Sequence, residues 1–314
     1  MGSTQSLRKD KNDLVALHSP SWRSDENVDL GHPHRNVPFF FTRTGATSAL
    51  EGMYIGSSAF LMAGGPSVNH LNLSLLENVW VMTLNNSTKT FRGAANCIVD
   101  DPSRFSLSTW LDPKIMKFTP MSHFEKPLWD NRLITEGEGF SQKWELSKLK
   151  VGDCPNVIGF RRNEKFHAPR WLSEETINWG NHGKFGGGRS VLLASLKILY
   201  LLGFKKVFLL GVDFEMSDDR RYHFDEERSP AAIKGNMQTY SKLAVWLDEL
   251  QPLFLKADYQ VFNCNPTSHL KAFPFCSFAN AVEEASSTLG NFIDEKTKGM
   301  YMEVKKKEST VDSK

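Results

Sequence analysis

The chain has 314 residues, of which 40% are hydrophobic and 11% aromatic, so it is long and apolar enough for one large folded domain. Lys and Arg total 38 against 36 for Asp and Glu, and this net charge of +2 gives no strong signal for nucleic acid or an anionic membrane as partner. No apolar stretch reaches the roughly 20 residues that cross a bilayer, so we expect no membrane span. Four cysteines show no CxxC pair or zinc spacing and no signal peptide precedes them, which favours a reduced, cytoplasmic setting.

Both ends of the chain are polar. Residues 1–50 are rich in Pro, His, Asp and Arg with little periodicity, which predicts a partly disordered arm. The first residues, MGSTQS, fit the pattern for myristoylation of Gly2; the alternative is an unmodified polar leader. Residues 291–314 predict a solvated tail, which leaves 51–290 as the folded domain.

Seven short apolar runs follow one another from residue 59 onward, and most lack a polar face. They cover residues 59–63, 79–85, 96–101, 115–120, 156–160, 205–214 and 259–265. Runs that are apolar on both faces suit a parallel sheet covered by helices. Helical patterns at 189–203 and about 234–255 separate the last runs, so the fold class predicted is α/β with a doubly wound, mostly parallel sheet.

The interval 121–184 has a different pattern, with aromatic and basic residues and several glycines. We expect it to form an inserted lid or subdomain over the sheet edge where ligands bind. Its aromatic side chains could close a substrate pocket, and they could equally serve packing.

The first apolar run ends directly in Gly64, Gly65, Pro66 and Ser67. Ligands of an open parallel sheet bind beyond the carboxyl ends of its strands. The two glycines allow the backbone to turn tightly and approach an anion, while Ser67 and the amides after it can donate hydrogen bonds. The sequence has neither a GxGxxG fingerprint nor a Walker lysine here, and a purely structural turn is the alternative.

A second glycine cluster, residues 186–188, opens the strongest helical pattern of the chain. A helix that begins after Gly188 at Arg189 and Ser190 presents unpaired N–H groups and the positive end of its dipole to an anion. Arg189 could add a charged fork to that site. The alternative is an ordinary glycine loop with a serine cap.

The sixth apolar run leads to Asp213, and a loop containing Tyr222 and His223 follows. An Asp at a strand end points into the ligand crevice, where it can bind ribose hydroxyls, a metal or an acceptor hydroxyl. His223 is the best-placed general base of the sequence, because imidazole titrates near neutral pH. A surface position without catalytic role is the alternative for this histidine.

Two further strand ends carry polar pairs. Asn85 and Asn86 stand at the end of the second run, and their carboxamides can recognise a base or sugar edge. Asp100 and Asp101 end the third run, where paired carboxylates can hold Mg²⁺ or Mn²⁺ or can simply start a turn. We assign no metal ligand, and we treat Mg²⁺ or Mn²⁺ as an option for the site.

Together and in this order, the motifs resemble the Rossmann-like superfamily of bacterial CMP-sialic-acid-dependent sialyltransferases, flagellin-modifying motility accessory proteins and 6-hydroxymethylpterin pyrophosphokinase-like proteins. LMAGGPSVNHLN resembles its nucleotide loop, and VMTLNNS its strand that ends in Asn. GRSVLLASLKILYLLGFKKVFLLGVDF, followed by YHF, resembles its helix, strand and Tyr-x-Phe. The likeness spans about residues 59–225.

The resemblance implies that Gly65, Pro66 and Ser67 cradle a nucleotide, that Asn85 and Ser190 contact it, and that Tyr222 donates to the leaving phosphate. The chain also departs from the family pattern. Gly64 replaces the family's Asn before Gly-Pro-Ser, and a second tyrosine is replaced near Glu215. The family's downstream base histidine has no clear counterpart around residues 233–234, so His223 would have to substitute for it.

The resemblance and the motifs predict a transferase that moves a sugar from a nucleotide-sugar donor, CMP-linked in the family, to a hydroxyl acceptor. We expect no required cofactor, and a homo-oligomer is compatible with the sequence. Two alternatives stay open. One is a Mg²⁺-dependent pyrophosphokinase-like enzyme acting on a hydroxymethyl group, and the other is a non-catalytic nucleotide-binding protein.

Overall fold

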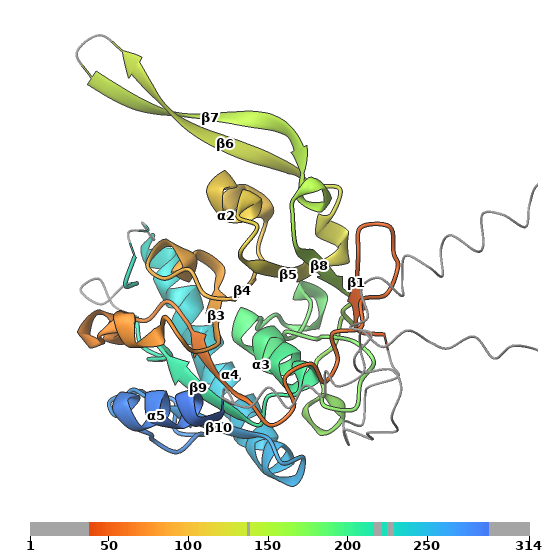
Figure 1. The fold of residues 1–314 in the computed structure, drawn as a ribbon, viewed down its shortest axis with the longest axis vertical. Coiled ribbons are helices and arrows are strands. Elements are labelled where there is room, and N and C mark those ends of the chain that lie inside the picture. Colours follow the sequence, from red (N-terminus) through yellow and green to blue (C-terminus); the bar gives the residue numbers. More distant parts are fainter. Residues whose placement is uncertain (1–37, 137–138, 217–221, 225, 227–228, 289–314) are drawn as a thin grey trace, which may run out of the picture.

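A computed structural model describes residues 38–136, 139–216, 222–224, 226 and 229–288, with only the backbone described for 131–144 (Figure 1). Gly2, most of the expected polar arm and the tail lie outside the described residues. The central strands are β1 (Phe40–Phe41), β2 (Ser58–Met62), β3 (Val81–Leu84), β4 (Ala95–Cys97), β5 (Met116–Pro120), β8 (Val157–Phe160), β9 (Lys206–Leu210) and β10 (Gln260–Asn263). A separate hairpin comprises β6 (Pro127–Glu136) and β7 (Gly139–Lys150), and the helices are α2 (Leu107–Leu111), α3 (Val191–Leu202), α4 (Pro230–Lys256) and α5 (Phe278–Thr288).

The central sheet has eight strands in the order β1-β8-β5-β4-β3-β2-β9-β10, and all are parallel except β1, which pairs antiparallel with β8. The chain runs outward from β2 to β8 and then returns to the other side of β2 with β9 and β10. The order therefore reverses between β2 and β9, and the carboxyl edge at such a point is where open α/β sheets bind ligands. The fold is α/β with a mostly parallel sheet, consistent with a Rossmann-like fold, and each of the seven predicted runs overlaps one strand.

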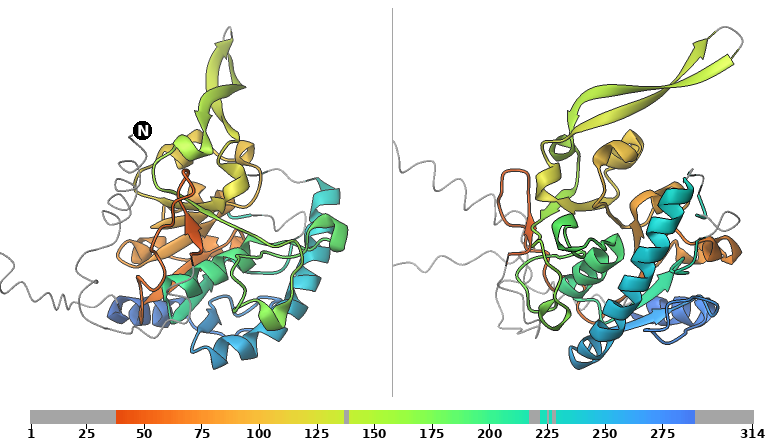
Figure 2. Two further views of the ribbon diagram at one scale, coloured as in Figure 1. Left: turned by 90° about the vertical axis from the view of Figure 1, so that its right-hand side faces the viewer. Right: turned by 180° about the vertical axis from the view of Figure 1, so that it is seen from behind.

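Helices cover both faces of the sheet, which explains why its strands have no polar face. Ala59 and Leu61 of β2 pack in the larger core cluster with α3 and α4. Phe60 and Met62 point to the opposite face and pack in a second cluster with α5. Figure 2 shows α3 and α5 on opposite sides of the sheet.

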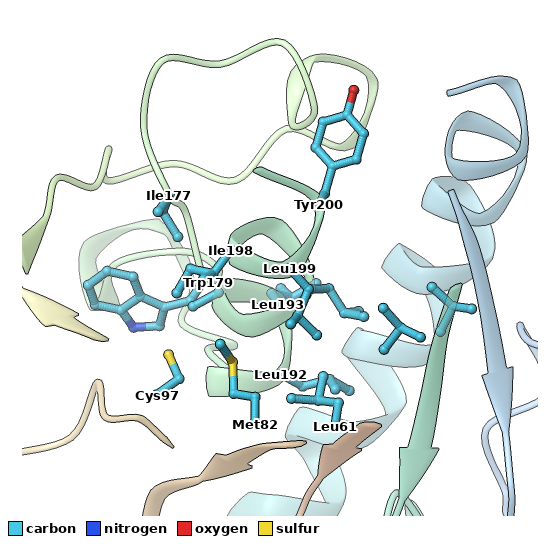
Figure 3. Packing of buried hydrophobic residues seen from close by; sticks show 14 of the residues in the cluster. Leu61, Met82, Cys97, Ile177, Trp179, Leu192, Leu193, Ile198, Leu199 and Tyr200 are labelled. Carbon is cyan, nitrogen blue, oxygen red and sulfur yellow. The ribbon is translucent and has the colours of Figure 1, made fainter. Parts of the chain in front are cut away.

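Helix α3 is the central buried helix, and eleven of its residues are buried. Ser190 caps its start by accepting a hydrogen bond from the amide of Leu192 at 3.1 Å, and Gly203 ends it in the left-handed conformation. Leu192 and Leu193 lie in one core cluster with Leu61 of β2 and Met82 of β3 (Figure 3). The predicted helix at 189–203 is confirmed, and so is the one at 234–255, which begins earlier as α4. Helices α2 and α5 were not expected from the sequence.

The ordered fold begins earlier than the polar arm predicted for residues 1–50. Phe39, Phe40 and Phe41 are buried, and the last two form the edge strand β1. Burial of three consecutive phenylalanines removes a large apolar surface from water and outweighs the polar composition around them. The boundary at residue 50 is therefore corrected to the start of this aromatic run.

Residues 121–184 contain two different structures. The hairpin of β6 and β7 projects away from the body of the molecule (Figures 1 and 2). Strand β8 lies in the same interval and pairs with β5 in the central sheet. The interval is thus not a single insertion, because its apolar run at 157–160 completes the sheet.

Within the described residues, no helix is both long enough and apolar enough to cross a membrane. All four cysteines are unpaired, and Cys97, Cys154 and Cys264 are buried.

Candidate functional site

The carboxyl edge between β2 and β9 contains two neighbouring cavities. The larger has a volume of about 710 Å³ and is lined by residues from the ends of β2, β3, β4 and β9 and from the starts of α3 and α4. The smaller has a volume of about 570 Å³ and lies between the loops that follow β2, β9 and β10. Gly211, Asp213 and Glu215 line both cavities.

Most of the residues expected to form the site meet at these cavities although the sequence separates them widely. The larger cavity is lined by Gly64, Gly65, Asn85, Asn86, Arg189, Ser190, Asp213 and Tyr222. Pro66 and Ser67 line the smaller one. Gly188 and His223 line neither. Of residues 121–184, Trp179 lines the larger cavity, so the structure does not show the expected lid closing over it.

Asp213 joins three loops at the centre of the site. Its Oδ2 accepts a hydrogen bond from the Ser67 amide at 3.0 Å, and its Oδ1 accepts from the Ser67 hydroxyl at 2.5 Å. The side-chain amide of Asn265 donates to the same Oδ1 at 2.9 Å. These bonds fix the orientation of the carboxylate at the boundary between the two cavities.

Gly64 and Gly65 provide room for groups of this chain. A Cβ atom at Gly65 would lie 2.4 Å from the Gly211 carbonyl oxygen and 2.6 Å from the Asp213 carboxylate, and one at Gly64 would lie 2.7 Å from the Tyr222 ring. The amides of Gly65 and Ser67 already donate to Gly211 and Asp213. An anion that bound these two amides would have to displace those hydrogen bonds. Anion binding by this loop therefore stays a prediction.

The turn after β9 explains why the predicted strand at 205–214 ends at Leu210. Gly211 has a φ of 64° and Phe214 a φ of 56°, which are left-handed conformations that break the strand. Left-handed backbone is uncommon for a phenylalanine and is typical of functional sites. The Phe214 ring stacks on Tyr240 of α4 with 5.1 Å between centroids, and both line the larger cavity.

The rim after β3 contains polar groups without partners. Asn85 has a φ of 48°, and its side-chain amide donates to Asp100 at 3.2 Å. The Asn86 amide donates to Glu226 at 2.9 Å. The Asn85 Oδ1 and the fully buried Ser87 Oγ have no hydrogen-bond partner among the described residues, although both residues line the larger cavity. Buried polar atoms are nearly always paired in folded proteins, so these two atoms mark a place for a ligand or water.

Positive charge collects near the start of α3. Arg189 lies next to the Ser190 cap, and its guanidinium has no hydrogen-bond or ion-pair partner in the described part of the chain. The guanidinium of Arg162 stacks over Trp179 at 3.8 Å, and burial, followed by the charge of Arg189, lowers the pKa of Arg162. Lys89 and Arg104 line the same cavity. The dipole of α3 adds to the attraction for an anion.

Gly188 contributes to packing, since a Cβ atom there would lie 3.1 Å from the Trp246 ring. Tyr222 and Phe224 form an aromatic wall of the larger cavity, and their rings are stacked with 5.0 Å between centroids. The side-chain amide of Asn236 lies 3.5 Å from the Tyr222 hydroxyl.

His223 holds the loop in place through both of its ring nitrogens. Its Nε2 lies 2.9 Å from the Ala63 carbonyl, so this nitrogen carries the proton, and its Nδ1 lies 2.8 Å from the Thr90 hydroxyl. Burial lowers the pKa of His223. A role as general base stays a prediction, and the Thr90 hydrogen bond would have to open for it.

The two acidic residues after β4 point to different partners. Asp101 accepts from Lys126 at 2.8 Å, and this bond is the main cause that lowers the pKa of Asp101. Asp100 and Asp213 line the larger cavity together with Glu215 and Glu226, so carboxylate oxygens that could bind Mg²⁺ or Mn²⁺ are present there. The described residues contain no group of three or more His, Cys, Asp or Glu side chains arranged to hold a metal ion.

Sequence reasoning missed several residues of the site. Asn265 is the last residue of the last predicted run, and the strand-end rule that identified Asp213 could have identified it. Ser87 lies one residue beyond the predicted asparagine pair. Arg104, Asn236 and Tyr240 have no local signal, because they reach the cavity only through tertiary packing.

The chain matches no known protein family, no curated protein and no solved structure.

Proposed function

We propose that the chain is a transferase that binds a nucleotide-sugar in the larger cavity and transfers the sugar to a hydroxyl acceptor. The observation that carries this proposal is the composition of one cavity of about 710 Å³, where cationic, neutral polar and aromatic side chains line the same space. The cavity lies at the carboxyl edge where the strand order reverses, which is the usual ligand site of an open α/β sheet. Cavities of about 300–1,000 Å³ are typical of small-molecule sites. A cavity of this size can hold a nucleoside diphosphate sugar or a CMP-sugar.

The phosphate end of the donor is assigned to the start of α3. The guanidinium of Arg189 is unpaired in the described part of the chain, and a bidentate guanidinium–phosphate pair is among the strongest charge-assisted contacts. The α3 dipole favours the same charge at the same place. Lys89 and Arg104 supply further positive charge to the cavity.

The nucleoside end is assigned to the rim after β3. The unpaired Asn85 Oδ1 and Ser87 Oγ can hydrogen-bond ribose hydroxyls or a base edge. Such contacts would satisfy two polar atoms that are otherwise buried without partners, which favours binding. The ring of Tyr240 offers an apolar surface in the same cavity.

The chemistry assigned to the site is a displacement at the sugar carbon that bears the phosphate. The acceptor oxygen bonds to that carbon as the carbon–oxygen bond to phosphate breaks, and the electron pair leaves on the nucleotide. Tyr222 can donate a hydrogen bond to the leaving phosphate oxygen. The acceptor proton passes to a base, for which Asp213 and His223 are the candidates.

Isothermal titration calorimetry with CMP, UDP, GDP and ATP tests the binding half of the proposal. Arg189→Gln is expected to weaken binding of the preferred nucleotide by about 10- to 100-fold, because it removes a charged hydrogen bond worth about 1.5–3 kcal/mol. Lys184→Gln is the matched control, since it removes the same charge from the same segment at a residue that lines neither cavity. Equal affinities for the two variants, or no binding of any of the four nucleotides, would contradict the proposal.

A pyrophosphokinase-like activity has one supporting observation, the presence of Asp100 and Asp213 in the same cavity. Two carboxylates can hold Mg²⁺ against the phosphates of ATP. Preferential ATP binding, with turnover abolished by EDTA, would favour this alternative. Nucleotide binding without turnover of any donor would favour a non-catalytic binding protein.

A further inference from the structure

We propose that the smaller cavity binds the acceptor substrate, and that this acceptor is a neutral polyhydroxyl compound such as a sugar. The cavity lies between residues 66–71 after β2, 211–215 after β9 and 264–267 after β10. The inference rests on the proposed function, because it assigns the second substrate of that reaction.

The position of the cavity supports a second substrate. Its wall at Gly211, Asp213 and Glu215 also belongs to the larger cavity, so molecules bound in the two cavities would both lie next to the Asp213 carboxylate. A transfer between two substrates requires their reacting atoms to lie about 3–3.5 Å apart. Two cavities that share a wall at one carboxylate can bring two substrates together at that group, whereas two distant cavities could not.

The chemistry of the lining decides the class of ligand. None of the described residues that line the smaller cavity is a lysine or an arginine, whereas Lys89, Arg104 and Arg189 line the larger one. Asp213 and Glu215 give the smaller cavity negative charge, so a phosphate group would be repelled from it. Both carboxylates also line the larger cavity, so the two cavities differ in that the larger one has cations to offset them and the smaller one has none among the described residues.

Neutral hydrogen-bonding groups supply the rest of the polar lining. Asn69, His70 and Thr267 are exposed side chains at the mouth of the cavity and can donate to or accept from hydroxyl groups. Ser67 and Asn265 already donate to the Asp213 carboxylate, which reduces the charge that it offers to a cation. A volume of about 570 Å³ suits a mono- or disaccharide.

The reaction step then follows from the arrangement. The acceptor hydroxyl in the smaller cavity loses its proton to the Asp213 carboxylate. Its oxygen forms the new bond to the donor carbon, while the phosphate leaves into the larger cavity with the electron pair of the broken bond. Ser67 and Asn265 act as positioning residues, since they hold the carboxylate at the boundary between the two substrates.

Saturation-transfer NMR with a panel of methyl glycosides tests the site on the full-length chain, in the presence and absence of CMP and UDP. Thr267→Trp fills the mouth of the smaller cavity, and Asn69→Trp does so from the loop after β2; both positions are exposed. The matched control is Thr239→Trp, which fills the larger cavity from α4. The substitutions in the smaller cavity should therefore affect glycoside binding, and the substitution in the larger cavity should affect nucleotide binding.

We expect at least one glycoside to bind the unmodified chain, and either plug of the smaller cavity to abolish that signal while nucleotide affinity changes less than 2-fold. Thr239→Trp should leave glycoside binding intact and abolish nucleotide binding. Glycoside binding that survives both Thr267→Trp and Asn69→Trp overturns the inference, as does the absence of binding across the panel. If either result is found and nucleotides still bind, the assignment of the acceptor site is wrong while the proposed function stands. If no nucleotide binds the unmodified chain, the proposed function is wrong as well.

Discussion

The close approach of the loops after β2 and β9 gives the sharpest test of the site's construction, through the variant Gly65→Ala. The new Cβ would lie 2.4 Å from the Gly211 carbonyl oxygen and 2.6 Å from the Asp213 carboxylate. The loops would have to separate by about 0.6 Å to bring the first contact to 3.0 Å, a distance below which Cβ contacts essentially never occur. The backbone at Gly65 has φ −66° and ψ 145°, which alanine adopts freely, so the expected effect is steric only.

Overpacking of this kind costs about 1–3 kcal/mol of unfolding free energy. With a urea dependence on the order of 3 kcal/mol per M, the unfolding midpoint should fall by roughly 0.3–1 M. Separation of the loops also moves Asp213 away from Ser67, so affinity for the preferred nucleotide should fall in the same variant. Urea unfolding followed by tryptophan fluorescence, together with calorimetry, measures both effects.

Gly183→Ala is the control, because a Cβ atom there would meet nothing within 4 Å. Its unfolding midpoint and nucleotide affinity should stay within error of the unmodified chain. If Gly65→Ala changes the unfolding free energy by less than about 0.5 kcal/mol, the loops yield without cost and the steric argument is wrong. A destabilised Gly65→Ala with unchanged nucleotide affinity would mean that the loop is only a structural turn.

Two further predictions concern stability. Burial lowers the pKa of His123 to about 4, whereas the same side chain in the unfolded chain takes up a proton near pH 6.5. Protonation therefore favours the unfolded chain, and the free energy of unfolding should fall by up to about 3 kcal/mol as the pH drops from about 6.5 to about 4. His123→Gln should flatten this part of the urea-unfolding profile, and an unchanged profile would refute the assignment. Gly235→Ala, at an open and exposed position of α4, should raise the unfolding free energy by about 0.5–1 kcal/mol, and a lower thermal midpoint would show that the helix does not continue through this residue.

The sequence determined the strands of the sheet and the places where chemistry could occur. Apolar runs without a polar face are a local property, and they located the strands from β2 to β10 in the central sheet. The rule that ligands bind beyond strand ends then selected Ser67, Asn85 and Asp213 before any contact between them was known. The search for apolar runs missed Phe39–Phe41, whose polar surroundings concealed a short strand that joins the sheet by pairing with the distant β8.

Only the tertiary structure decided how those strand ends are combined. The order of strands brings β2 next to β9, and so places Ser67 against Asp213, which lies 146 positions further along the chain. The same packing fills the space beside Gly64 and Gly65 with Tyr222 and Asp213, so glycines that suggested an open notch serve a close contact within the protein. It also divides the carboxyl edge into two cavities. Such features depend on contacts between residues far apart in the sequence, whereas hydrophobic period and turn chemistry carry information about a few neighbouring residues only.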